Sequence, residues 1–225
     1  AETAFEEEQS ILLLGNDVSS RYTRRTPGEF EKIARYILKT GQAKQGNYMV
    51  FFPSYKMMQQ VYEVFWELND DKMECIIQQS GMKEAEREEF LGEFCRERGK
   101  TLIAFCVMGG IFGEGIDLKK EQLIGAIIVG TGIPQISNER EILMNYYDKR
   151  SGEGFDYAYR YPGMNKVLQA AGRVIRTVED IGVIELLDER FMQSDYRKLF
   201  PKEWENRKSC SIDSVESYLE QFWKS

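Results

Sequence analysis

Short apolar runs alternate with segments of helical periodicity along most of this sequence, and few folds accommodate such an alternation. The first clear run is Tyr48–Phe52, which is continuously apolar and ends at a proline and a serine, as expected of a parallel strand covered on both faces. Apolar residues then recur at helical spacing from Met57 to Leu68, which predicts a helix with one buried stripe. A strand followed by a crossover helix is the repeating unit of a parallel α/β sheet.

The same unit recurs downstream and predicts an α/β fold with a parallel sheet. Further strands are predicted at Glu74–Gln79, Thr101–Met108, Leu123–Val129 and Gly182–Leu187. Further helices are predicted at Lys83–Arg98, Asn138–Tyr147, Asn165–Thr177 and Asp213–Trp223. Between Pro134 and Pro162 the chain is polar and rich in tyrosine, and we interpret this stretch as an insertion.

Composition excludes several kinds of chemistry. The chain has no histidine, which removes the commonest general base, the Ser-His-Asp class and most zinc sites. No two cysteines form a Cys-x-x-Cys pair, so we expect core packing rather than metal binding for each of Cys75, Cys95, Cys106 and Cys210. The net charge of -7 opposes DNA binding through the field of the whole molecule, so any contact with DNA must be local.

The apolar runs are too short to cross a bilayer, and the N-terminal residues are acidic and polar rather than basic and then apolar. We therefore expect no membrane span, no signal peptide and a cytoplasmic protein.

The predicted helix at Asn165–Thr177 carries two arginines and a glutamine on one side. Its apolar residues form one stripe, while Gln169, Arg173 and Arg176 project from the opposite side at spacings of four and three. Guanidinium groups with a neighbouring amide suit phosphate oxygens and the charge that develops during phosphoryl transfer. From the spacing alone, a solvated helix face is the commoner explanation.

A glycine-rich loop follows the predicted strand at Thr101–Met108. Because it leaves a parallel strand, the loop belongs at the carboxyl edge of the sheet, where such sheets bind ligands. Gly109 and Gly110 permit tight turns and a close approach to the backbone. The loop is not a phosphate-binding P-loop, because no Gly-Lys-Ser/Thr follows it, and a purely structural loop is the commoner explanation for the glycines.

The most specific segment reads QAAGRVIR and is followed by DIGVIELLDERF (Asp180–Phe191). It closely resembles the last conserved motif, with its downstream strand, of the DinG- and XPD-like DNA helicases of superfamily 2. The resemblance implies a RecA-like parallel sheet with helices on both faces, the second motor domain of an ATP-dependent helicase. In that family the glutamine and the two arginines reach ATP bound on the first motor domain, so Gln169, Arg173 and Arg176 are the expected catalytic residues.

The glycine-rich loop resembles motif V of the same family, which couples ATP to single-stranded DNA. Glu114, Gly115 and Asp117 match its Glu-Gly-x-Asp core, and the resemblance implies that they bind the nucleotide. It also implies that the backbone of Gly109 and Gly110 faces DNA.

Two upstream segments resemble parts of the family that touch DNA. The sequence VFFPSY resembles motif IV, which makes Ser54 and Tyr55 candidates for DNA contact, although Ser54 suits a helix N-cap equally well. An aromatic ring such as that of Tyr55 can stack on a base. The sequence DVSSRYTRR resembles the segment that joins the two motor domains, so Arg21, Arg24 and Arg25 are candidates for DNA or interdomain contact; a solvated charge run is the usual explanation of such a cluster.

The resemblance covers most of the chain, from Asp17 to Pro201, but the chain lacks the Walker A and Asp-Glu-x-His motifs of the first motor domain. ATP and Mg²⁺ are therefore expected to bind mainly to the first RecA-like domain of the same parent chain, which with single-stranded DNA is the expected partner. No metal site is expected here, and the iron-sulfur cluster of many relatives is allowed for the parent protein only. The isolated chain is expected to be inactive, and a role in DNA repair is implied by the resemblance alone.

The expected organisation is an interdomain segment at 1–45, a RecA-like helicase domain 2 at 46–200 with an insertion at about 134–162, and a helical extension at 201–225. Two other functions stay open. One is a non-catalytic module, derived from a helicase half, that binds DNA or a protein partner. The other is a nucleotide-dependent α/β enzyme of another kind, which the absence of a Gly-x-Gly-x-x-Gly opening a helix disfavours.

Overall fold

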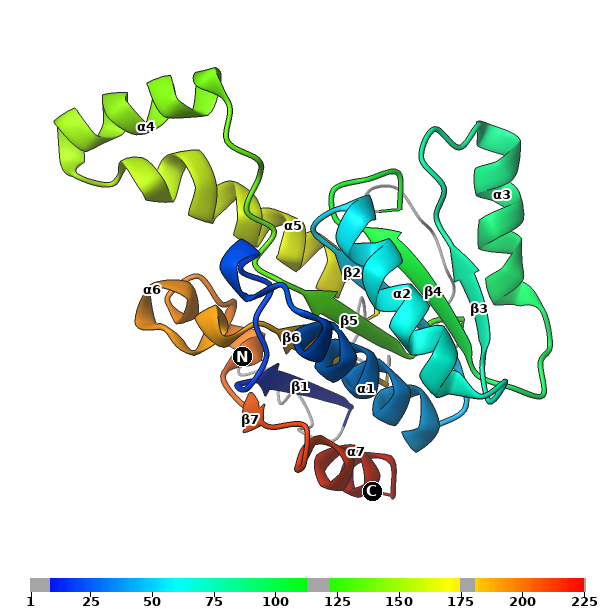
Figure 1. Cartoon of the computed structure of the whole chain (residues 1–225). Coiled ribbons are helices and arrows are strands. Elements are labelled where there is room, and N and C mark those ends of the chain that lie inside the picture. Colours follow the sequence, from blue (N-terminus) through cyan, green and yellow to red (C-terminus); the bar gives the residue numbers. More distant parts are fainter. Residues whose placement is uncertain (1–8, 113–121, 175–180, 225) are drawn as a thin grey trace, which may run out of the picture.

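The computed structural model describes residues 9–112, 122–174 and 181–224, and its strands form one parallel sheet (Figure 1). The sheet has seven strands in the order β3-β4-β2-β5-β6-β1-β7, and all of its neighbouring strands pair in parallel. The strands are β1 (Ser10–Gly15), β2 (Asn47–Phe52), β3 (Glu74–Ile77), β4 (Leu102–Val107), β5 (Gly125–Val129), β6 (Gly182–Leu187) and β7 (Lys208–Cys210). The predicted parallel α/β fold is confirmed.

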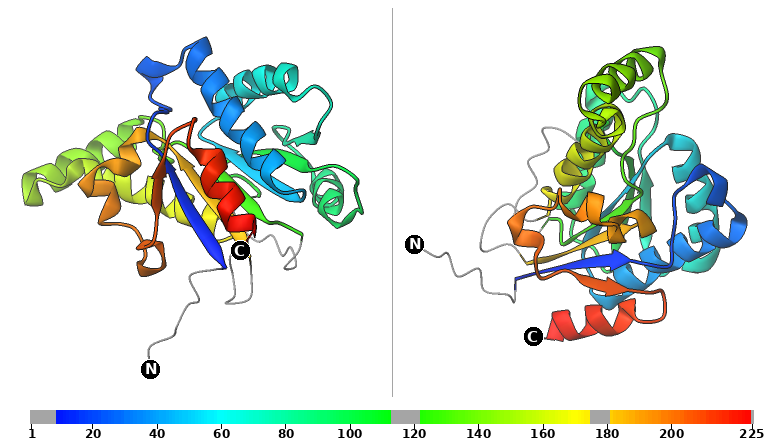
Figure 2. Two further views of the ribbon diagram at one scale, coloured as in Figure 1. Left: turned by 90° about the horizontal axis from the view of Figure 1, so that it is seen from below. Right: turned by 90° about the vertical axis from the view of Figure 1, so that its left-hand side faces the viewer.

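Helices cover both faces of the sheet, as the two turned views of Figure 2 also show. The α-helices are α1 (Pro27–Ala43), α2 (Tyr55–Asn69), α3 (Glu84–Gly92), α4 (Asn138–Ser151), α5 (Tyr161–Ala171), α6 (Ser194–Arg197) and α7 (Val215–Lys224). Side chains of α1, α2 and α7 pack on one face, and those of α3, α5 and α6 on the other. Strand β1 supplies both cores, with Leu13 on the first face and Leu12 and Leu14 on the second. None of the described helices is both long and apolar enough to cross a membrane.

Short helical turns complete the described chain. The 3-10 turns are η1 (Tyr22–Arg24), η2 (Glu93–Cys95), η4 (Glu189–Met192) and η5 (Lys202–Trp204), and η3 (Asp156–Arg160) is a π-helix that leads directly into α5.

The strands predicted from apolar runs are all present, but β1, β7, α1 and the short helix α6 were not predicted. Strand β7 is only three residues long and reads Lys-Ser-Cys, so no apolar pattern marks it. Helix α1 begins with a recognisable signal, because Thr26 caps it by accepting a hydrogen bond from Glu29 N and Pro27 follows at its first position.

Helix α5 differs from its predicted bounds at both ends. It starts at Tyr161 and ends at Ala171, after which Arg173 N and Val174 N donate to Ala170 O and Ala171 O at 3.2 Å each. These bonds span three residues instead of four, so the chain tightens into a turn at Gly172, and glycine has a low helix propensity. Arg173 therefore lies in a turn and not on the helix face where it was predicted.

The stretch interpreted as an insertion is largely helical. Helix α4, predicted at Asn138–Tyr147, continues to Ser151 and ends at Gly152, whose φ of +74° is left-handed. The chain then turns back, and η3 packs against α4. Figure 1 shows this hairpin extending from the sheet at the upper left, and α4 has no buried residue.

The cysteines divide between core and surface. Cys106 and Cys210 are buried and Cys75 is half-buried, but Cys95 is exposed, so the expectation of core packing is wrong for Cys95. The helix predicted as far as Arg98 ends at Gly92, and the 3-10 turn η2 that follows has a different periodicity. Phe94 is still buried there, while Cys95 turns outward.

A buried carboxyl group lies in the middle of β6. Glu185 is fully buried, and its Oε1 lies 2.7 Å from the hydroxyl of Thr40 on α1. The same hydroxyl lies 2.9 Å from Tyr36 O, and one hydroxyl carries a single proton. Burial raises the pKa of Glu185 from its ordinary 4.5 to about 8, against the opposing effect of the hydrogen bond with Thr40. The raised pKa favours the protonated form of Glu185 at pH 7, and the proton of this form can complete the bond to Thr40.

The parent should lose stability as the pH rises, because Glu185 must ionise, and we expect Glu185→Gln to abolish this loss. Between pH 4.5, where the unfolded chain ionises, and about 8, the folded chain binds more protons at Glu185, so the free energy of unfolding falls across this window. The variant should be more stable than the parent at pH 8, by at most about 5 kcal/mol at 1.36 kcal/mol per pKa unit, and the difference should vanish near pH 4.5. Urea unfolding at several pH values measures this difference.

Glu67→Gln is the control, because Glu67 is exposed on α2. It should leave the pH dependence of stability unchanged. A Glu185→Gln curve parallel to that of the parent would show that Glu185 is ionised in the folded chain.

Candidate nucleotide and nucleic-acid interface

The segments predicted to contact DNA meet at the carboxyl edge of the sheet, joined by a residue that was not predicted. Gln78 follows β3 and is buried. Its amide nitrogen donates to the hydroxyl of Tyr55 at 3.0 Å, and its amide oxygen accepts from Val107 N at 2.8 Å. Tyr55 starts α2 after strand β2, and Val107 ends β4 just before Gly109. One amide therefore holds together two segments that are more than 50 residues apart.

Ser54 caps α2. Its backbone is extended and its hydroxyl accepts a hydrogen bond from Met57 N at 3.3 Å, so the capping alternative is realised. The half-buried hydroxyl still lies at the carboxyl edge, and contact with DNA stays a prediction. Tyr55 is 38% exposed, and burial of its hydroxyl raises its pKa.

The two glycines after β4 lie between side chains from two other elements. Gly109 has a φ of +67°, which favours glycine, and a Cβ at this position would lie 3.0 Å from Cε of Lys166 on α5. A Cβ at Gly110 would lie 3.1 Å from the amide nitrogen of Gln78. Any larger residue would displace one of these neighbours. The sequence identified both glycines as candidate site residues, but it did not predict that Lys166 and Gln78 lie beside them.

Helix α5 runs from the carboxyl edge of the sheet towards the amino edge. The side chain of Lys166, at the middle of the helix, lies against Gly109, whereas Val174, just after the helix ends, lies against Gly182, the first residue of β6. Gln169 is exposed and Arg173 is half-buried, and both lie between these two positions in the chain. Of the residues expected to contact ATP, the two that the structure describes, Gln169 and Arg173, therefore lie nearer the amino edge than Gly109 does.

Four predicted residues lie outside the described part of the chain, and their predicted roles are not tested. They are Glu114, Gly115, Asp117 and Arg176.

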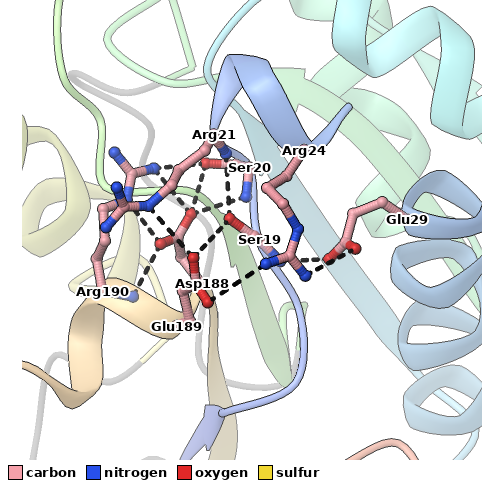
Figure 3. Close-up of polar contacts among 8 residues, drawn as sticks. All are labelled: Ser19, Ser20, Arg21, Arg24, Glu29, Asp188, Glu189 and Arg190. Carbon is pink, nitrogen blue, oxygen red and sulfur yellow. Dashed lines mark hydrogen bonds and ion pairs between the residues drawn. The ribbon is translucent and has the colours of Figure 1, made fainter. Parts of the chain in front are cut away.

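The predicted basic segment belongs to a polar cluster, drawn in Figure 3, that comprises Ser19, Ser20, Arg21, Arg24, Glu29, Asp188, Glu189 and Arg190. At its centre is Asp188, which follows β6 and is fully buried. Its carboxylate accepts from Ser20 N at 2.9 Å and from the Ser20 hydroxyl at 2.6 Å, and it accepts from Arg190 Nε at 2.7 Å. Burial alone would raise the pKa of Asp188, but Arg190 and Ser20 together hold it below its ordinary value.

The arginines of the basic segment share carboxylates within the cluster. Arg21 pairs with Glu189 at 3.2 Å, and Arg24 lies 3.8 Å from Glu29 and 3.9 Å from Glu189. Their side chains stay 45% and 53% exposed. Arg25 instead donates to Ser20 O at 3.2 Å. The segment is thus partly neutralised rather than a free cationic surface, and its contact with DNA stays a prediction.

Known proteins resemble this chain over most of its length. The family of helicase C-terminal domains matches residues 37–207. The chain belongs to this family. Among curated relatives, Regulator of telomere elongation helicase 1 of Pongo abelii is 29% identical over 83% of this chain and 16% of its own length. The ATP-dependent DNA helicase XPD of Sulfolobus acidocaldarius is 28% identical over 82% of this chain and 32% of its own length.

XPD helicases also resemble this chain in their fold. A solved XPD helicase structure superposes with a TM-score of 0.73 and 24% identity, covering 90% of this chain and 35% of the other. The chain is thus a helicase C-terminal domain of the XPD-like superfamily with a RecA-like fold, as the resemblance implied. It spans less than two thirds of each of these relatives.

We expect Asp188→Asn to destabilise this helicase C-terminal domain by about 3 kcal/mol, because it leaves the mostly buried Arg190 without its counter-charge. The loss should be full above pH 3.8 and shrink at lower pH, where the parent carboxylate is itself protonated. Urea unfolding measures it. Glu189→Gln, at a side chain that is 35% exposed, should cost less than about 1 kcal/mol; equal losses for the two variants would contradict the central place of Asp188.

We expect Gln78→Met to cost about 1–3 kcal/mol of unfolding free energy, because it keeps the side-chain length but leaves Val107 N without its acceptor. Tyr55→Phe should cost less, and the double variant should cost less than the sum, because both remove the same bond. Additive losses would mean that the bond between Gln78 and Tyr55 contributes nothing.

Proposed function

We propose that this chain is the second motor domain of an ATP-dependent DNA helicase, which closes over ATP on a first RecA-like domain and contacts single-stranded DNA. The observation that carries the proposal is the course of α5. The side chain of Lys166, at the middle of the helix, lies beside the glycine turn at the carboxyl edge, and the turn that contains Arg173 follows the last residue of the helix. A single helix therefore connects the proposed DNA side with the proposed nucleotide side, and a motor must transmit movement between these two sides.

The nucleotide side consists of donors that fit phosphate oxygens. Gln169 presents an exposed amide, and Arg173 a guanidinium held in the turn after α5. Arg176 is proposed as the second arginine. Guanidinium groups bind phosphate through paired hydrogen bonds and stabilise negative charge that develops on the transferred group. ATP supplies that group, and we propose that the first motor domain holds ATP and Mg²⁺.

The DNA side consists of Ser54, Tyr55 and the backbone of Gly109 and Gly110. Gln78 bonds to both Tyr55 and Val107, and so links the tyrosine to the strand that ends at the glycine turn. An aromatic ring beside an accessible backbone suits a single strand without selecting its sequence. Closure of the two motor domains around ATP would displace this edge along the strand.

In the protein that joins this chain to a first motor domain, we expect Arg173→Ala and Arg176→Ala each to lower DNA-stimulated ATP hydrolysis by about 10³-fold or more. The loss follows because each substitution removes donors that stabilise the transferred phosphate. Steady-state ATP hydrolysis with and without single-stranded DNA measures it.

Arg35→Ala is the matched control, because Arg35 is half-exposed on α1 and pairs with Glu31. It should leave turnover unchanged. Normal turnover in both Arg173→Ala and Arg176→Ala would rule out the proposed role of the two arginines. A joined protein that binds DNA but never hydrolyses ATP would instead establish the non-catalytic binding module.

A further inference from the structure

Lys166 lies at the proposed DNA edge without any role from the family motifs. It is half-buried on α5, and its stem lies against Gly109, where the missing Cβ leaves room for Cγ, Cδ and Cε. Long lysine stems pack in this way while the ammonium group stays hydrated. Gly109 and Lys166 therefore fit each other, and the fit keeps a cation beside the glycine turn.

Within the described part of the chain, the surroundings of Lys166 disfavour its charged ammonium group. Among the described residues, none of the carboxylates forms an ion pair with Lys166. Burial, and then the charge of Arg140, lower the pKa of its ammonium group. A bound anion would offset both effects.

Arg140 is a second cation held near the same place. It lies in the first turn of α4, and its guanidinium donates to Ala158 O of η3 at 2.8 Å. This bond fixes the side chain at the base of the hairpin formed by α4 and η3. Two cations from separate elements thus lie on the α5 side of the glycine turn, while Gln78 and Tyr55 lie on the other.

We propose that Lys166, supported by Arg140, binds a phosphate of the single DNA strand that passes over the turn at Gly109 and Gly110. This inference rests on the proposed function, since it assigns a phosphate contact to the same edge. A phosphodiester fits better than a carboxylate ligand, because Tyr55 on the opposite side of the turn offers a ring that is still 38% exposed for a base. In a chain with a net charge of -7, such local cations are the means by which DNA can be held.

The test compares Lys166→Met, which keeps the stem over Gly109 and removes the charge, with Lys166→Arg, which keeps the charge. The protein that joins this chain to a first motor domain is titrated against fluorescein-labelled oligo-dT, without nucleotide, over a range of salt concentrations. One phosphate contact contributes about 0.7 to the slope of log K against log salt on a single strand. Lys166→Met should lower the slope by about 0.7 and weaken binding about fivefold at roughly 0.1 M salt.

Lys166→Arg should restore the slope, and the KM for ATP should stay at its parent value in both variants. Lys224→Met is the control, because Lys224 is exposed on α7 and pairs with Glu220. An unchanged slope in Lys166→Met, a loss that Lys166→Arg does not restore, or a raised KM for ATP with normal DNA binding would each overturn the inference and leave the proposed function standing. Failure of the parent protein to bind oligo-dT would overturn both.

Discussion

Strands β2, β4 and β5 are almost entirely buried, because helices pack on both faces of the parallel sheet. A parallel sheet covered in this way leaves its strand ends as the places where backbone and polar side chains reach solvent. The carboxyl ends of β2, β3 and β4 lie side by side in the strand order. For this reason Tyr55, Gln78 and Gly109 come together although they are far apart in the sequence.

Polar groups that are buried at this edge serve to join segments. Asp188 fixes the chain around Ser20 to the end of β6 across 168 residues, and Gln78 fixes α2 to β4. Each is buried with several hydrogen bonds, which is the condition under which a buried polar group stabilises a structure. Glu185 is the contrasting case, because its Oε2 has no hydrogen-bond partner within the described residues and the carboxyl group is held neutral instead.

Helix α5 has a dual place in this architecture. Its apolar stripe, including Val167 and Ala171, packs on the sheet, which fixes the helix relative to the strands on either side. The side chain of Lys166 thereby lies at the carboxyl edge, whereas Arg173 lies beyond the last turn of the helix. The π-helix η3 runs directly into α5 and packs against α4, so α4 is connected to the sheet through α5.

Apolar periodicity along the sequence predicted the strands β2, β4 and β6, the helix α2 and the middle of α5, because such periodicity reflects which face of an element is buried. The sequence also identified Ser54, Gly109 and Gln169 as candidate site residues. The addition of β1 and β7 to the sheet is visible only in the folded chain, since β7 pairs with β1 and no apolar pattern marks its own residues. Only the tertiary structure likewise placed Gln78 between two segments, paired Arg21 with Glu189 and set Lys166 against Gly109. These contacts join residues distant in the chain, and periodicity carries no information about such pairs.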